Sequence, residues 1–272
     1  MAEAVKAVPA VAAIGVGVPC TIDQRRGIAV AAVNLPLTDV PLRDILNERI
    51  GLPSFIDNDA NVAGLAEVRH GAAQGLDHVI MLTVGTGICG AIVLDGELYR
   101  GSVGAAGELG HMVVSASGPR CQGNCPNHGC LEAMASGTAL ARAGRAAAER
   151  EPESELGRAA AGGKEITGRL VTETAVAGDE AARGALAEIG AWLGIGIASY
   201  VNIFNPEAVV VGGGVIAAGD LLLEPARREV AARALPPGRD LVRVLPADFG
   251  ADAGLLGAAT LAYDELGRLD VG

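Results

Sequence analysis

The chain has 272 residues, of which 50% are hydrophobic and 19% are charged, a composition typical of a folded globular protein. Its formal net charge of -11, without a local basic cluster, repels nucleic acids and anionic membrane surfaces. Aromatic residues make up only 3% of the chain, which argues against a surface that stacks bases.

The N-terminal residues do not indicate export, because Glu3 interrupts the positive-then-apolar order of a signal peptide. We therefore expect a cytoplasmic protein whose five cysteines are reduced thiols or metal ligands. The longest uncharged run, residues 189–206, contains glycine, serine and asparagine, so it predicts a buried core helix and no membrane contact.

The N-terminal part of the chain combines short apolar runs with helical periodicity, which predicts an α/β fold. Residues 12–18 and 52–56 are apolar runs of strand length. Residues 60–70 carry apolar side chains at helical spacing, and Gly71 follows where a helix would end. The polar residues between the second strand and this helix are therefore expected at a strand-to-helix turn.

The middle of the chain predicts a hairpin followed by helical structure. Residues 79–84 and 88–94 flank a glycine-rich turn, which is typical of an antiparallel pair of strands. Residues 131–150 are rich in alanine and predict one long helix. Residues 151–163 contain glutamate, proline and glycine and predict a mobile surface segment.

The C-terminal part continues the alternation of helices and strands. Apolar residues three or four positions apart predict a long, largely buried helix over residues 179–204. The remaining predicted elements are a buried strand over residues 208–211, a tight turn over 212–214, and helices over 220–234 and 251–266.

The most specific group of residues is a cluster of potential metal ligands. His111 precedes Cys121, Cys125 and Cys130, and the three cysteines lie among turn-forming glycines and prolines. Three thiolates and one imidazole satisfy the tetrahedral preference of zinc. His128, between two of the cysteines, is an alternative fourth ligand, and three unrelated buried thiols are the alternative to a metal site.

The polar residues Asp57, Asn58, Asp59 and Asn61 form a second group at the predicted start of a helix. Such residues usually cap a helix by accepting hydrogen bonds from its first amides. A carboxylate at this turn could instead take a proton from a substrate hydroxyl. The sequence leaves both interpretations open.

Two glycine-rich loops form the third group. Glycines allow backbone amides to approach phosphate oxygens closely, but ordinary hairpin and strand-to-helix turns also use glycine. The loop residues are Gly85, Thr86, Gly87 and Gly90 in the first loop and Gly212, Gly213 and Gly214 in the second.

Taken together and in this order, these residues resemble the ROK family of repressors, open reading frames and sugar kinases, within the actin-like ATPase superfamily. The likeness extends from about residue 13 to the end of the chain. The motifs that carry it are IGVGVP at residues 14–19, NLPL at 34–37, DNDANVAGLAE at 57–67, LTVGTGICGAIV at 82–93, LYRGSVGAAGELGH at 98–111, GCLEAMASG at 129–137 and NPEAVVVGGGVI at 205–216.

The resemblance implies a two-lobed, actin-like ATPase (ribonuclease H-like) α/β fold. Residues 1–74 would form the first lobe, completed by a C-terminal helix over 250–272. Residues 75–249 would form the second lobe, which contains the zinc knuckle, the segment from Cys121 to Cys130. Members of this family are commonly dimers or tetramers, so a homo-oligomer is expected.

The resemblance further implies an ATP-dependent hexose kinase that uses Mg²⁺, with glucose as the default substrate. Asn58 and Asp59 would bind the sugar, with Asp59 as the catalytic base. The other implied roles are sugar contacts by Glu108, His111 and Glu132, a structural zinc ion held by His111, Cys121, Cys125 and Cys130, ATP phosphate contacts by Gly85, Thr86 and Gly87, and adenosine contacts by Gly212, Gly213 and Gly214.

The chain departs from the family pattern in three places. Three residues separate Cys121 from Cys125, where the family usually has one, and Cys20 stands where glycine is common. The family's N-terminal D-x-G-G-T phosphate loop does not occur, so the first lobe is expected to be truncated at Met1. Two alternatives to a kinase follow, namely the sugar-sensing domain of a ROK repressor and an inactive sugar-binding remnant.

Overall fold

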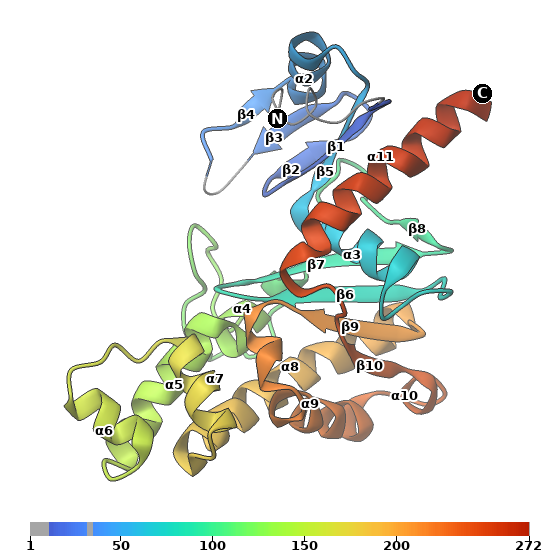
Figure 1. Cartoon of the computed structure of the whole chain (residues 1–272). Coiled ribbons are helices and arrows are strands. Elements are labelled where there is room, and N and C mark those ends of the chain that lie inside the picture. Colours follow the sequence, from blue (N-terminus) through green and yellow to red (C-terminus); the bar gives the residue numbers. More distant parts are fainter. Residues whose placement is uncertain (1–10, 32–34, 272) are drawn as a thin grey trace.

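Three sheets organise the part of the chain that the computed structural model describes, residues 11–31 and 35–271 (Figure 1). The largest has the strand order β10-β9-β6-β7-β8. Its strands are β6 (Val79–Val84), β7 (Ile88–Leu94), β8 (Glu97–Leu98), β9 (Ala208–Gly212) and β10 (Arg243–Pro246). β6 and β7 form the predicted antiparallel hairpin, whereas β9 and β10 run parallel to β6.

The two smaller sheets are built from the N-terminal residues. β1 (Ile14–Val18) and β5 (Ser54–Asn58) pair in parallel, as two of the predicted strands. β2 (Thr21–Asp23), β3 (Ile28–Ala31) and β4 (Thr38–Val40) form an antiparallel sheet, and α2 (Leu42–Ile50) connects β4 to β5.

Helices cover both faces of the largest sheet. α3 (Asp59–His70) and α11 (Ala253–Val271) lie on one face. The remaining helices are α4 (Leu131–Ala135), α5 (Gly137–Arg150), α6 (Glu155–Ala161), α7 (Gly168–Val176), α8 (Glu180–Phe204), α9 (Asp220–Arg233) and α10 (Gly238–Leu241). Because strand side chains alternate between faces, Val79 and Met81 pack toward α3, whereas Ile80 and Leu82 pack toward α8.

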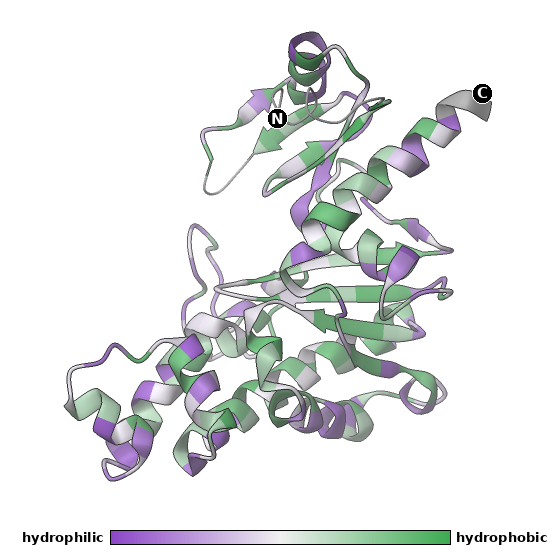
Figure 2. Ribbon diagram, viewed as in Figure 1, coloured by the Kyte–Doolittle hydropathy of each residue, from purple (hydrophilic) through white to green (hydrophobic). Residues whose placement is uncertain are grey.

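α8 confirms the long buried helix that the apolar spacing predicts. It is long and apolar enough to cross a membrane, but 61% of its most apolar stretch is buried inside the protein. It packs against α5, α7 and α9. Figure 2 shows that the hydrophobic colour continues from β6 and β9 into the helices beneath them, so α8 is a core helix.

Two predicted segments differ from the structure. Residues 131–150 do not form one helix, because Ser136 ends α4 and its hydroxyl accepts the amide of Ala139 at 3.3 Å to begin α5. Residues 151–163 contain the helix α6 rather than only a loop. Leu156 anchors α6 in the core, and Ser154 caps it by accepting the Gly157 amide at 2.9 Å.

α11 returns to the N-terminal elements and packs against α3 and β1. A salt bridge of 3.1 Å between Arg69 of α3 and Asp264 of α11 reinforces this contact. α11 thus joins the elements of residues 1–74, as in the proposed division into lobes 1–74 with 250–272 and 75–249, while α3 also packs on the largest sheet of the second proposed lobe.

The contact between α3 and α11 depends on a glycine that cannot be enlarged. A Cβ atom at Gly257 would lie 1.6 Å from the carbonyl oxygen of Val62, whereas one at Gly267 would meet no atom within 4 Å. We expect Gly257→Ala to lower the free energy of unfolding by about 1 to 3 kcal/mol, because α11 must move. Gly267→Ala, the same change in the same helix, should raise it by about 0.5 to 1 kcal/mol. Urea denaturation measures both, and equal effects would contradict the packing.

Candidate active site

The strand-to-helix turn between β5 and α3 separates the roles of its polar residues. Asn58 caps α3, because its Oδ1 accepts the amides of Ala60 at 2.9 Å and Asn61 at 3.3 Å. Its amide nitrogen also donates to the carbonyl of Cys20 at 3.3 Å, which fixes the plane of the side chain. Of the two interpretations that the sequence left open, helix capping therefore applies to Asn58.

The two aspartates at this turn have opposite environments. Asp57 is buried, pairs with Arg100 at 2.7 Å, and accepts hydrogen bonds from the Asn58 amide and the Asn61 side chain. Asp59 is exposed, and one of its oxygens accepts the Ala60 amide at 2.9 Å. Within the described residues its second oxygen has no protein partner, so only Asp59 is free to accept a proton.

A small cavity of about 30 Å³ lies beside this turn. It is lined by Thr21, Asn58, Cys89, Gly90, Gly104, Ala106, Gly107 and Glu108. This volume is about that of one water molecule, so a bound hexose would require the surrounding segments to separate. The predicted sugar residues Asn58 and Glu108 both lie at this cavity.

Cys89 and Thr21 line the small cavity and were not predicted from the sequence as site residues. The Cys89 side chain reaches solvent but is partly enclosed by protein. This partial burial, and the negative charges of Asp59, Glu108 and Glu132, raise the pKa of the Cys89 thiol to about 11. Three of the predicted site carboxylates are therefore close to one thiol. The signal in the sequence that could have marked Cys89 as a site residue was its polarizable side chain, placed between Ile88 and Gly90 in the predicted strand β7.

The predicted metal ligands His111, Cys121, Cys125 and Cys130 come together. Their ligand atoms all lie within 4.8 Å of one another, with 3.5 Å between His111 Nδ1 and Cys121 Sγ. The Sγ atoms of Cys125 and Cys130 are 3.9 Å apart, close to the roughly 3.8 Å between thiolates of a tetrahedral zinc site with 2.3 Å bonds. His128 lies outside this cluster and is exposed.

The ligands lie in or beside short elements and in the loop between them. His111 ends a short 3-10 helix, η1 (Leu109–His111), and Cys130 precedes α4. Burial raises the pKa of both the Cys121 and Cys130 thiols, so their thiolates need a positive charge nearby. Three thiols and one imidazole fit a zinc ion and leave no coordination position open for water.

The loop between β6 and β7 presents backbone amides rather than carbonyls. The Gly85 carbonyl accepts the Gly137 amide at 2.7 Å, and the Thr86 carbonyl accepts the Thr138 hydroxyl at 2.9 Å. In the described part of the chain, the amides of Thr86 and Gly87 have no protein acceptor. Two adjacent free amides are suited to bind an anion such as a phosphate.

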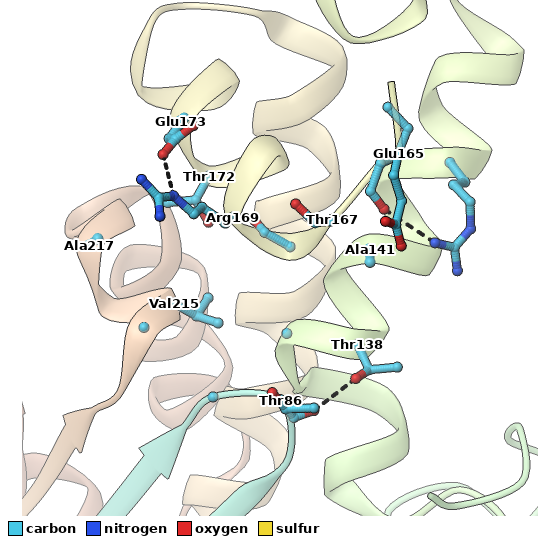
Figure 3. Close-up of a pocket in the computed structure, with 16 residues that line it drawn as sticks. Thr86, Thr138, Ala141, Glu165, Thr167, Arg169, Thr172, Glu173, Val215 and Ala217 are labelled. Atoms are coloured by element: carbon cyan, nitrogen blue, oxygen red, sulfur yellow. Dashed lines mark hydrogen bonds and ion pairs between the residues drawn. The ribbon is translucent and has the colours of Figure 1, made fainter. Parts of the chain in front are cut away.

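A second cavity, of about 750 Å³, opens beside this loop (Figure 3). Its walls come from the β6–β7 loop, α5, α7 and the 3-10 helix η2 (Gly214–Ala218). Of the six predicted nucleotide residues, Gly85, Thr86 and Gly214 line it directly. The other polar wall residues were not predicted from the sequence; they are Thr138, Arg145, Glu165, Thr167, Arg169, Thr172 and Glu173.

The remaining three glycines, Gly87, Gly212 and Gly213, allow close packing. A Cβ atom at Gly87 would lie 2.2 Å from Glu132 Oε2, and one at Gly213 would lie 2.4 Å from the Val84 carbonyl. Gly213 also has a φ of 88°, a region that favours glycine. A Cβ atom at Gly212 would lie 2.8 Å from Met81 Cε.

These features define the class of the protein. The mixed sheet with helices on both faces and the returning C-terminal helix is the actin-like ATPase fold, and the structures of a ROK glucokinase and a ROK hexokinase share it. The chain belongs to the ROK family, whose family model matches residues 1–265. The resemblance inferred from the motifs is thereby confirmed.

Individual relatives have different functions. The chain is 38% identical to a glucokinase of Halalkalibacterium halodurans, over 95% of this chain and 78% of that protein. It is 37% identical to a putative xylose repressor of Caldicellulosiruptor sp., over 97% of this chain and 66% of the repressor. The structure of a ROK glucokinase from Streptomyces griseus with glucose and AMPPNP has a TM-score of 0.81 at 37% identity, over 97% of this chain and 87% of that one.

The ligand cluster generates a test of metal binding. We expect about one zinc ion per chain, and we expect Cys125→Ser to lose most of it, because removing one of four ligands opens the site. Cys89→Ser, which changes a cysteine outside the cluster, should keep the metal. Elemental analysis of the purified proteins measures the content. Zinc that persists in Cys125→Ser would contradict this ligand set.

Proposed function

We propose that the chain is an ATP-dependent hexose kinase that phosphorylates glucose to glucose 6-phosphate, with Asp59 as general base. The observation that carries the proposal is that one hairpin lines both cavities. Gly85 and Thr86 face the large cavity, and Cys89 and Gly90 face the small one. Even fully extended, residues 85–90 would span at most about 20 Å, so a nucleotide and a sugar on the two sides of the hairpin would be close together.

The free carboxylate of Asp59 supports its role as the base. It would accept the proton of the sugar's primary hydroxyl as that oxygen attacks the γ-phosphoryl group in line. The cap formed by Asn58 fixes the start of α3, and therefore the position of Asp59 relative to the cavity. Glu108, His111 and Glu132 would bind the other hydroxyls and so hold the attacking oxygen in place.

The nucleotide would be held mainly by the backbone of the β6–β7 loop. The amides of Thr86 and Gly87 would donate to phosphate oxygens, and Gly214 would lie near the adenosine. Mg²⁺, bound with ATP, would neutralise charge on the phosphates. Transfer is direct, and no covalent enzyme intermediate is needed.

The zinc ion would have a structural role in this proposal. His111 lies 3.8 Å from Glu108, so a ligand of the metal also adjoins the sugar cavity. Cys121 Sγ lies 3.7 Å from Glu132 Oε1 and donates to it as a thiol. A thiolate bound to a metal cannot donate, which would leave that carboxylate oxygen for a substrate hydroxyl.

A second candidate function is a sugar-sensing domain, because the chain also matches a putative xylose repressor at 37% identity. A kinase must release ADP and a sugar phosphate, whereas a sensor or an inactive remnant binds sugar without turnover. Incubation with ATP, Mg²⁺ and glucose, mannose, fructose or N-acylated hexosamines distinguishes them. Sugar binding without ADP release would overturn the kinase assignment.

The two aspartates of the turn provide a matched pair of variants. Asp59→Asn should lower turnover by about 10² to 10⁴ with sugar affinity largely kept, because the shape remains and the base is lost. Asp57→Asn should mainly lower the free energy of unfolding, by about 2 to 4 kcal/mol, because it breaks the buried pair with Arg100. Steady-state kinetics and thermal denaturation measure the two effects. Turnover of Asp59→Asn above about a tenth of wild type would place the base elsewhere.

Cys89 reports on whether the small cavity receives the sugar. Since its pKa is raised to about 11, alkylation should be slow at pH 7 and should accelerate about tenfold per pH unit up to that value. Saturating glucose should slow the reaction at pH 8.5, because the sugar would cover the thiol. Peptide mass spectrometry follows the modification, with Cys89→Ser as the background. An alkylation rate that glucose does not change would argue against this cavity as the sugar site.

A further inference from the structure

Gln122 connects the metal-ligand cluster to the loop that faces the large cavity. It follows Cys121 directly and is one of the residues that lengthen the segment between Cys121 and Cys125. Its half-buried side chain crosses to the β6–β7 loop. There its amide nitrogen donates to the Thr86 carbonyl at 3.3 Å and to the Ser136 hydroxyl oxygen at 2.9 Å.

This contact determines where a backbone amide points. The carbonyl of Thr86 and the N–H of Gly87 belong to one planar trans peptide unit, so they point in opposite directions. Donors from Gln122 and Thr138 hold the carbonyl from the side of the knuckle and α5. The Gly87 amide is therefore directed away from the knuckle, where it is free to meet a phosphate oxygen.

The same loop is fixed at its other end. The Ile88 amide donates to Glu132 Oε2 at 2.9 Å, and the other oxygen of Glu132 lies 3.7 Å from Cys121 Sγ. A thiolate of Cys121 bound to a metal would not donate to Glu132, so the attachment that persists with the metal site filled is that of Gln122. Cys121 and Gln122 are consecutive, so a displacement of the metal ligand Cys121 would move Gln122 and its contact with the loop.

We propose that Gln122 is a positioning residue for the nucleotide, through which the metal-ligand cluster controls the phosphate-facing loop. The inference rests on the proposed function, since the ligand is ATP. Its consequence is that filling the metal site tightens nucleotide binding, in addition to any effect on the sugar. Gln122 is not one of the grouped metal ligands, and it is not among the residues that line the large cavity.

The test compares two variants within the same knuckle segment. Gln122→Ala should raise the Kd for Mg-ATP by roughly five- to thirty-fold, from the loss of two hydrogen bonds, and should leave zinc content and the Kd for glucose unchanged. Asn124→Ala should bind ATP like wild type, because Asn124 makes no side-chain hydrogen bond within the described residues and is exposed. Gln122→Glu, which keeps the shape but cannot donate, should weaken ATP binding at least as much as Gln122→Ala.

Calorimetry with Mg-ATP and with glucose separates the outcomes. Wild type that binds no ATP would overturn the kinase assignment and this inference together. Wild type that binds ATP, with a Gln122→Ala variant of equal affinity, would overturn this inference alone. Loss of zinc with equal weakening of ATP and glucose binding would also overturn it, because that pattern marks collapse of the knuckle. Chelation should weaken ATP binding less in Gln122→Ala than in wild type, and an equal effect would contradict the link to the metal.

Discussion

The candidate site is organised around the buried carboxylate of Glu132. One oxygen accepts the Ile88 amide at 2.9 Å, and the other lies 3.7 Å from Cys121 Sγ. Burying a carboxylate is costly unless it is hydrogen-bonded, so the hairpin and the knuckle are held on either side of it. Gly87 is required for the same reason, since a Cβ atom there would lie 2.2 Å from Glu132 Oε2. The glycine-rich loop and the GCLE motif are thus parts of one interaction.

On the opposite face of the largest sheet, a second buried carboxylate also holds separate segments together by accepting their backbone amides. Glu67 of α3 is fully buried and accepts the backbone amides of Ala72, Asp248 and Phe249 at 3.0 to 3.1 Å. These bonds fix the segment that enters α11, and hence the packing of α11 on α3. α3 carries Asp59 at its other end, so the position of the proposed base depends on how this helix is held.

Elements whose apolar pattern is long and regular could be predicted from the sequence alone. β6, β7, β9, α3 and α8 bury continuous or periodic apolar residues, and each was predicted. The break at Ser136 was not predictable in this way, because alanine-rich helix lies on both sides and only the Ala139 contact shows the cap. The small sheet β2–β4 and the helices α2 and α7 were also not predicted. β4 and α2 contain no fully buried residue, so their apolar pattern is weak.

The candidate site shows a similar division. The polar cluster at residues 57–61 and the ligand cluster could be found from residue types and spacing. The difference between Asp57 and Asp59 could not, because it arises from Arg100, which is distant in the sequence and reaches Asp57 only in the folded chain. Gln122 was equally hidden, since a glutamine in a knuckle has no pattern that predicts contact with Thr86.

The charges around the large cavity indicate how an anionic ligand would be bound. Among its described lining residues, the cationic side chains are Arg145 and Arg169. Arg169 pairs with Glu173 at 2.7 Å, and Arg145 donates to the Ile166 carbonyl at 3.2 Å, so neither is free of a protein partner. Phosphate recognition would then depend on the amides of Thr86 and Gly87, whose directions are set by the contacts of their peptide units. In a chain with a net charge of -11, such fixed dipoles attract an anion locally where side-chain charge does not. For binding an anionic ligand, the geometry of the β6–β7 loop therefore matters more than the charge of the surrounding surface. That geometry depends on Gln122, Thr138 and Glu132, which contact the loop.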